Sequence, residues 1–458
     1  MSACPRQFHR ESFLDTTVGC VSTRRRCASP LWNEVHPAVV CARENHDELG
    51  RDSVTNASVR CWIAASILAF AIAPLAHAEL PQLDPVQMLG PNDTDANDDP
   101  SQLPSPPRFG AGLALQGNVA LAGMPGAFDE KGRVAALVRN SSGKWIRTQT
   151  LTASTAKAGA GFGEHIAICS MCALITSRTD VYIFKLKSGK WSEAGKLPFG
   201  RAVQVRDLDS HWNTVVVGAS DSTGDAVYAF RINTDGTFRR IARFAAPDAA
   251  SGDRFGERVA VYSSTVAVTA PGYNSGQGAV YVFGCSDTHC VQRQKVLAND
   301  GRHGDGFGEA VDLASGILVV GAPSANWVPG DPARPPSEEN HRAGGSAYLF
   351  VRKGATWIEQ QKLHPGARQL NWYATFGNQV RVSATHVVIG APYQVDEFEP
   401  GFVVDYHWSG GSLYAARMMV NDTSHGDALA LHNNTLLAGI PEAPPYWGGA
   451  AVYNLPAQ

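Results

Sequence analysis

Apolar and polar positions alternate along most of the chain after residue 107, in stretches too short for amphipathic helices. In residues 108–126, RFGAGLALQGNVALAGMPG, an alternating run is followed by a short turn and a second apolar run that ends at a proline. Residues 306–324, GFGEAVDLASGILVVGAPS, have the same arrangement. Because alternation with a period of two is typical of half-buried β-strands, each stretch predicts a pair of short strands.

This pair of strands recurs seven times. A third apolar strand follows, as in GAVYVFG (278–284), and most units have a fourth, as in CVQRQKVL (290–297). Residues 79–458 divided by seven give roughly 54 residues per unit, close to the ~40–50 residues of blade-type repeats. Each unit begins with an FG dipeptide or a variant of it, at Phe109-Gly110, Phe162-Gly163, Phe199-Gly200, Phe255-Gly256, Phe307-Gly308, Phe376-Gly377 and, degenerately, His425-Gly426.

Four-stranded units repeated around an axis form a β-propeller, so we predict an all-β, seven-bladed propeller. The last unit stops after its third strand, at residues 450–458. The segment LDPVQMLGPND (83–93) matches the fourth strands of other units. We therefore expect residues 84–90 to complete the last blade and close the ring, because an open ring would leave unpaired strand edges.

The phrases FGEAVDLASGILVVGAP (307–323) and GDRFGERVAVYSSTVAVTAP (252–271) resemble the FG-GAP repeat of integrin α-chain propellers and of bacterial exported proteins. The resemblance covers residues 84–458 and implies a seven-bladed propeller. We expect the FG phenylalanines to bury their rings between neighbouring blades. The adjacent glycines would allow close backbone approach or positive φ, so the motif has a structural role.

Some members of this family bind calcium in an aspartate-rich loop between the first two strands of a blade. Here only the third such turn, RDLDSHWN (206–213), keeps candidate oxygen ligands, at Asp207, Asp209 and Asn213. His211 and Trp212 stand where the pattern has an oxygen ligand and a glycine. A solvated acidic turn is therefore the favoured interpretation, with calcium as the alternative, and we expect no other cofactor or metal.

The N-terminal region predicts export. Residues 61–76, CWIAASILAFAIAPLA, follow Arg60 and precede an Ala-His-Ala cleavage site at 76–78. We assign residues 58–78 to a signal peptide, residues 1–57 to a non-native or disordered leader, and residues 79–458 to a single propeller. A membrane anchor is the alternative, but the run is short for a span and contains Pro74. We expect a periplasmic, cell-surface or extracellular protein with no stable membrane span.

Four cysteines remain after cleavage, Cys169, Cys172, Cys285 and Cys290. An even number in an exported chain favours disulfides. Each pair flanks a predicted turn between two strands, where opposed residues meet the distance that a disulfide needs. Redox chemistry at CSMC and a zinc site are less favoured alternatives, because no helix lowers a thiol pKa and the pairs fall in non-adjacent blades.

Charge and motifs narrow the function further. The 458 residues carry a net charge of −3, which gives no reason to expect a nucleic acid as partner. The sequence has no metalloprotease, nucleophile-elbow, phosphate-loop or dinucleotide motif. Glu397 and Glu399 could in principle form a carboxylate pair for sugar hydrolysis, but solvated loop charge is the favoured interpretation.

Long connections cluster in units five to seven, at residues 324–344, 366–375, 393–401 and 442–448, and in the linker 92–107. Loops on a rigid scaffold are where binding usually resides. We hypothesise an adhesion or binding module for a protein or carbohydrate, with a polysaccharide hydrolase or lyase and a structural envelope protein as alternatives. The candidate ligand contacts are Trp327, Asp331, Trp372, Tyr373, Glu397, Phe398, Tyr446 and Trp447.

Overall fold

A computed structural model describes most of the chain after residue 79. The described residues are 80–90, 107–170, 172–233, 235–325, 344–364, 375–392, 401–409, 411–420, 425–441 and 448–457. The predicted leader and signal peptide lie outside these residues. Within the described part of the chain, no helix is long and apolar enough to cross a lipid bilayer.

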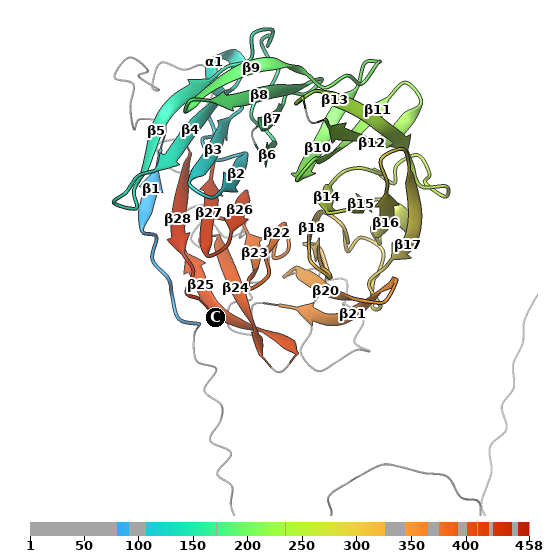
Figure 1. Cartoon of the computed structure of the whole chain (residues 1–458). Helices are drawn as coiled ribbons and strands as arrows, with labels where there is room; N and C mark the ends of the chain where they lie inside the picture. The colour runs from blue at the N-terminus through green and yellow to red at the C-terminus, as the bar shows by residue number, and fades with distance from the viewer. Residues whose placement is uncertain are drawn as a thin grey trace, which may run out of the picture. The chain divides into compact units, whose positions relative to one another are not determined.

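Seven four-stranded antiparallel sheets stand around a common axis, as the seven-bladed propeller prediction requires (Figure 1). Blades 1 to 3 contain β2 (Leu113–Gln116), β3 (Val119–Met124), β4 (Arg133–Arg139), β5 (Trp145–Leu151), β6 (Ile166–Cys169), β7 (Cys172–Thr176), β8 (Val181–Lys187), β9 (Lys190–Lys196), β10 (Gln204–His211), β11 (Thr214–Asp221), β12 (Gly224–Ile232) and β13 (Phe238–Phe244). Blades 4 and 5 contain β14 (Val259–Tyr262), β15 (Thr265–Ala270), β16 (Ala279–Cys285), β17 (Cys290–Val296), β18 (Ala310–Ala314), β19 (Ile317–Ala322), β20 (Ser346–Lys353) and β21 (Thr356–Leu363). Blades 6 and 7 contain β22 (Gln379–Val382), β23 (Val387–Ala391), β24 (Phe402–Ser409), β25 (Ser412–Val420), β26 (Leu429–His432), β27 (Thr435–Ile440), β28 (Gly449–Asn454) and β1 (Gln87–Leu89).

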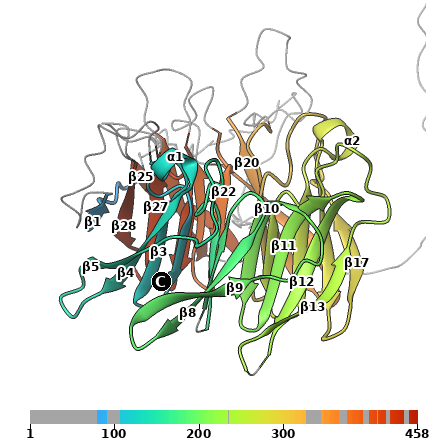
Figure 2. The same cartoon turned by 90° about the horizontal axis from the view of Figure 1, so that it is seen from above.

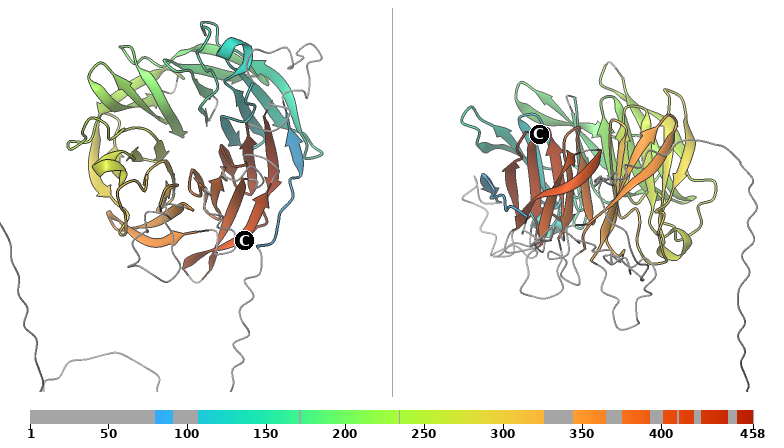
Figure 3. Two further views of the ribbon diagram at one scale, coloured as in Figure 1. Left: turned by 180° about the vertical axis from the view of Figure 1, so that it is seen from behind. Right: turned by 90° about the horizontal axis from the view of Figure 1, so that it is seen from below.

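The N-terminal strand closes the ring, which confirms the prediction. Strand β1 pairs antiparallel with β28, with Gln87 opposite Val452 (Figure 3). The paired segment, Gln87–Leu89, is shorter than the predicted 84–90. The residues just before it reach the neighbouring blade, because the Leu83 N–H donates to the Met418 carbonyl of β25 at 3.0 Å. Residues 80–89 therefore join the outer edges of blades 6 and 7.

The hydrophobic core lies between adjacent blades rather than inside one sheet. Each FG phenylalanine is buried in a cluster that contains residues of its own blade and of the preceding one. Phe162, for example, packs edge-on against Tyr182, with ring centroids 5.4 Å apart, in a cluster that also contains Val134 of blade 1. Such aromatic pairs add to the free energy gained by burying apolar area.

The glycines of the repeat lie at the same boundaries between adjacent blades, which we call seams. The FG glycines have positive φ, such as +102° at Gly163 and +94° at Gly377. Where the second strand of the preceding blade has a glycine near its end, the carbonyl of the FG glycine lies against the Cα of that residue, so that Gly163 contacts Gly123 and Gly377 contacts Gly321. A Cβ on either second-strand glycine would overlap a carbonyl group. The two halves of the repeat motif thus form one contact between blades.

Glutamine side chains join the outer strands of neighbouring blades. Each side-chain amide donates to the carbonyl of a residue in the next blade's outer strand and accepts from that residue's N–H, as a paired strand would. The four pairs are Gln87–Trp145, Gln149–Trp191, Gln294–Trp357 and Gln361–Leu413, with N···O distances of 2.7–2.9 Å.

Two single-turn helices mark one face of the ring. Helix α1 (Ala127–Glu130) joins the second and third strands of blade 1, and α2 (Tyr273–Gly276) does so in blade 4. Both lie on the same side in Figure 2, which we call the upper face. Because every blade runs in the same direction, the connections between second and third strands, and those between blades, all leave from the upper face.

Candidate functional site: the axial channel

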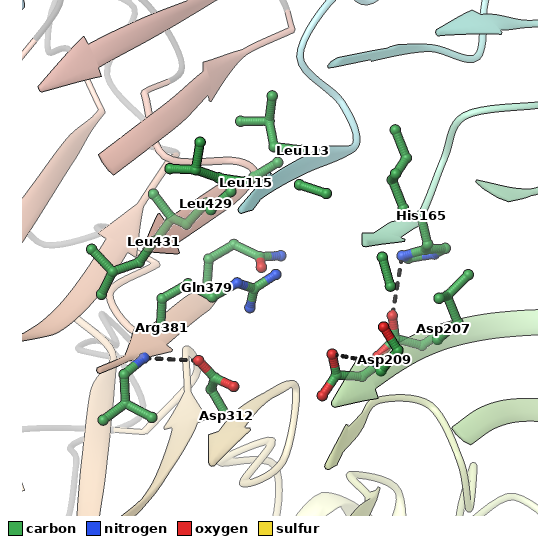
Figure 4. A pocket seen from close by; sticks show the side chains of 18 of the residues that line it. Leu113, Leu115, His165, Asp207, Asp209, Asp312, Gln379, Arg381, Leu429 and Leu431 are labelled. Atoms are coloured by element: carbon green, nitrogen blue, oxygen red, sulfur yellow. Dashed lines mark hydrogen bonds and ion pairs between the residues drawn. The ribbon is translucent and has the colours of Figure 1, made fainter. Parts of the chain in front are cut away.

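The first strands of the seven blades surround a cavity of about 550 Å³ on the axis of the ring (Figure 4). Every inner strand contributes to its wall, from β2 through β26. A propeller leaves such a space because its inner strands belong to different sheets and do not pair with one another. The channel is therefore a preformed site whose chemistry depends on the side chains that point inward.

The wall of the channel has an apolar part and a polar part. Blades 7 and 1 contribute leucines, which include Leu113, Leu115, Leu429 and Leu431. Blades 2, 3, 5 and 6 contribute the polar part, which includes His165, Asp207, Asp209, Asp312, Gln379 and Arg381. A wall of this kind fits a ligand that has both hydroxyl or charged groups and an apolar surface.

The aspartates of β10 accept hydrogen bonds from the edge of the next inner strand. The Val259 N–H donates to Asp207 Oδ2 at 2.9 Å, and the Val261 N–H donates to Asp209 Oδ2 at 2.7 Å. Asp312 of β18 does the same for blade 6, since its Oδ2 accepts from the Val382 N–H at 2.8 Å. These carboxylates satisfy backbone amides that would otherwise have no strand partner.

Burial and neighbouring charges separate the pKa values of these groups. Burial, together with the negative charge of Asp312, raises the pKa of Asp209 to about 7. Burial likewise raises the pKa of Asp312. Asp207 behaves differently, because although burial opposes its ionisation, the hydrogen bond and charge of His165, 3.2 Å away, hold its pKa below the usual value. Near neutral pH, Asp209 therefore exchanges a proton while Asp207 stays ionised.

The structure separates the three calcium candidates. The segment RDLDSHWN is mostly strand β10, followed by a two-residue turn at Trp212 and Asn213, rather than an acidic loop. Asn213 lies apart from Asp207 and Asp209, and its Oδ1 accepts a hydrogen bond from Arg231 at 2.9 Å. It lines a separate hollow of about 290 Å³ with Trp212.

The cysteines form two pairs at hairpin turns. Cys169 and Cys172 face each other across the β6–β7 turn, with Cα atoms 5.0 Å apart, and Cys285 and Cys290 do so between β16 and β17, at 4.0 Å. Both pairs lie at disulfide-bonding distance, in the register that the sequence indicated.

The eight proposed ligand contacts on the long connections, from Trp327 to Trp447, lie outside the described residues. The structure instead brings together channel residues that are not among the predicted site residues, namely His165, Asp312 and Arg381. A signal for them exists, because each is a polar residue in or next to a first strand whose alternation turns it away from the blade interior. Which first-strand residues converge on the axis depends on the closed ring, which spacing alone does not reveal.

A comparison with known protein families identifies the repeat. A profile of the FG-GAP repeat family matches residues 238–283 and 290–350. None of the curated proteins matches the chain. A solved structure of a Bacteroides uniformis protein, provisionally named a 6-phosphogluconolactonase, is similar at 11% identity with a TM-score of 0.47, over 69% of this chain and 86% of that one.

A Lactobacillus plantarum protein is similar at 12% identity with a TM-score of 0.47, over 69% of this chain and 84% of that one. At TM-scores below 0.5, neither likeness informs function. The matched residues run from the last strand of blade 3 into blade 5, and the glycine contact of the motif recurs between blades 1 and 2, 5 and 6, 6 and 7, and 7 and 1. The chain is therefore an FG-GAP repeat protein that folds as a seven-bladed β-propeller.

Proposed function

We propose that this propeller is an exported, non-catalytic binding module that recognises a protein or carbohydrate through the upper face of blades 5 to 7. The observation that carries the proposal is the unequal length of connections that start and end on that face. Between β19 and β20, 23 residues separate Ala322 from Ser346, whereas two residues separate Asp221 from Gly224 in blade 3. Long segments on a rigid ring are suited to recognition.

Three further observations support this proposal. Blades 5, 6 and 7 are consecutive, so the ends of their upper-face connections lie side by side and can form one continuous surface. The connections of blades 5 and 6 supply the extra length, because the eight residues between Ile440 and Gly449 in blade 7 equal those in blades 1 and 4. The FG-GAP repeat resembles that of integrin α-chain propellers. The two hairpin cysteine pairs favour an oxidising compartment, as expected for an exported protein.

Loop replacement tests the proposal. Residues 324–344 and 393–401 are each replaced by the short blade 3 connection, Ser222-Thr223, and the variant is compared with wild type on a glycan array and in pull-downs from the native envelope. We expect both variants to fold and to lose binding. The matched control replaces the α2 connection of blade 4 and should keep it. Equal binding by all three variants would reject the upper face of blades 5 to 7.

A second candidate function, cleavage of a polysaccharide by a hydrolase or lyase reaction, is favoured by one observation. Asp209 and Asp312 both line the channel, and the pKa of Asp209 is raised to about 7, which suits a general acid. If the channel is catalytic, a panel of polysaccharides will include one that is cleaved by wild type and not by Asp209→Asn. Absence of turnover over the whole panel, with binding retained, would favour the binding module.

A further inference from the structure

Blade 6 departs from the repeat at a buried position of its third strand. In six blades the third and fourth strands shift register at the same point, and the third-strand residue just before this shift is Asp405 in blade 6. The equivalent residues in the other blades are all apolar and buried: Ala136, Ile183, Ala229, Val282, Leu349 and, by its pairing with β27, Val452. A fully buried carboxylate at such a position needs a partner that compensates its charge.

Two histidines provide contacts to this carboxylate from both sides. His386 Nδ1 lies 3.0 Å from Asp405 Oδ1, and His407 Nε2 lies 2.8 Å from Asp405 Oδ2. His386 and Asp405 are fully buried, whereas the His407 side chain is 23% exposed. One ligand atom from each of the three residues lies within 4.8 Å of the other two. Asp405 and His407 alternate along one face of β24, and His386 immediately precedes β23.

Hydrogen bonding leaves this cluster incomplete. The buried His386 Nε2 has no hydrogen-bond partner among the described residues. Arg417 Nη1 lies 3.3 Å from His407 Nε2 and 4.0 Å from Asp405 Oδ2. If His407 Nε2 carries a proton for Asp405, then two donors face each other at the Arg417 contact. A positive ion bound by His386 Nδ1, Asp405 and His407 Nε2 would remove this conflict, because neither nitrogen would then carry a proton. His386 Nε2, the ring nitrogen that does not face Asp405, would be satisfied by a water.

We propose that His386, Asp405 and His407 form a binding site for a divalent transition metal of the zinc class. Two imidazoles and one carboxylate are a donor set that zinc prefers, with water in the remaining coordination position. The partly exposed His407 provides the side from which this water and the metal can enter. Arg417 would then support the carboxylate from outside the coordination shell, and its charge would limit the affinity.

The position of the site indicates a structural role. All three ligands belong to blade 6, and they connect the start of β23 to β24. Val403, which shares a face of β24 with Asp405, packs in a cluster with Leu436 of blade 7 and Leu83 of the N-terminal segment. The metal would thus reinforce the wall between blades 6 and 7, where residues 80–89 close the ring.

Zinc titration of the full chain, after removal of metal by a chelator, tests the site against a matched variant. In His386→Thr/Asp405→Val/His407→Val each ligand is replaced by a residue that other blades have there, Thr214, Val282 and Val351 among them. We expect wild type to bind one more equivalent of zinc than this variant. Zinc bound by cysteines outside the propeller is the same in both proteins, so it does not affect this difference. Zinc should also raise the Tm of wild type alone.

Single variants and spectroscopy keep the test decisive if the triple variant does not fold. His386→Thr should weaken zinc binding by more than about 100-fold, beyond the 10–100-fold typical for an outer-shell partner. Arg417→Gln, which installs the glutamine that blades 1, 4 and 5 have, should retain the site. The zinc X-ray absorption signal that wild type has and His386→Thr lacks should show imidazole and oxygen ligands without sulfur. Equal zinc stoichiometry in wild type and triple variant, unchanged binding by His386→Thr, or sulfur ligation in the difference between wild type and His386→Thr would overturn the proposal.

Discussion

His425 stands where the other six blades have the phenylalanine of the repeat. The side chain is fully buried, and its Nε2 is 3.0 Å from the Tyr453 hydroxyl. Burial lowers the pKa of His425 to about 4. Because the unfolded chain takes up a proton near the ordinary value of 6.5 and the folded protein does not, the free energy of unfolding falls as the pH decreases from 6.5 towards 4.

His425→Phe should remove this pH dependence. Relative to wild type, the variant should gain about 2 kcal/mol in the free energy of unfolding when the pH is lowered from about 8 to about 5. Urea denaturation at both values measures the difference, and the other histidines cancel in the comparison. A difference between the two proteins that does not change with pH would show that His425 takes up its proton at the same pH in the folded protein and in the unfolded chain.

Asp209 should make the free energy of unfolding depend on pH in the opposite direction. Its pKa in the folded protein, about 7, is raised above the ordinary 3.8, so its favourable contribution is complete below pH 3.8 and is lost as the pH rises through 7. The free energy of unfolding that Asp209→Asn gains over wild type should therefore be greater at pH 8.5 than at pH 4.5. The expected difference is about 2 kcal/mol, a value reduced to allow for solvent in the channel.

Urea denaturation of Asp209→Asn at the two pH values checks this prediction. Asp248→Asn is the control, because the hydrogen bond from Lys295 lowers the pKa of Asp248. Its carboxyl group is therefore ionised in the folded and the unfolded chain at both pH values, and the variant should change stability equally at pH 4.5 and pH 8.5. If Asp209→Asn changes stability equally at both pH values, the carboxyl group is ionised throughout and the account of its burial is wrong.

At the scale of strands and turns, the repeat was fully readable from the sequence. Period-two alternation and the FG and Gly-Ala-Pro phrases locate the blades, because each unit packs against its neighbours through the same kinds of residues. For the polar residues of β10 the sequence predicts a turn, but they form a strand, because an aspartate that accepts an amide from another blade has the same local sequence as one that binds calcium. The same limit hid the cluster around Asp405, because His407 lies two residues away on β24 but His386, just before β23, comes into contact only when the sheet forms.

The glycine contact between blades gives a test at this scale. In Gly321→Ala the new Cβ would overlap the Gly377 carbonyl of the next blade. We expect a loss of about 1–3 kcal/mol, as is typical when a methyl group is forced into packed structure. Gly90→Ala is the matched control, because a Cβ added there would have no atom beyond its chain neighbours within 4 Å, and its φ is not positive. Thermal unfolding of both variants measures the difference. Equal Tm values would show that blades 5 and 6 can move apart enough to accommodate the Cβ at little cost in free energy.

The whole molecule depends on one short strand, which supplies only three paired residues to blade 7. Leu89 of β1 is 3% exposed and packs in the cluster between blades 7 and 1, whereas the adjacent Met88 is 48% exposed. Leu89→Ala should cost about 2–5 kcal/mol. Met88→Ala should change stability by no more than about 0.5 kcal/mol.

Both closure variants are compared by urea denaturation with a fluorescence probe and a far-UV dichroism probe. If closure supports the entire ring, the two probes will report one shared transition at a lower urea concentration in Leu89→Ala. Separate transitions would mean that the blades unfold independently and that ring closure stabilises only blade 7.

Ring closure by β1 also sets an order of events during biosynthesis. The strand that completes blade 7 is made before any other strand of the propeller, yet its partner β28 is the last strand to be made. A nascent chain must therefore keep residues 80–89 unpaired while more than 350 residues follow them, as the interval from Leu89 to Gly449 requires. During that time the open edges of neighbouring chains offer competing partners, so exchange of this strand between two copies is the characteristic error that assembly of this propeller must avoid.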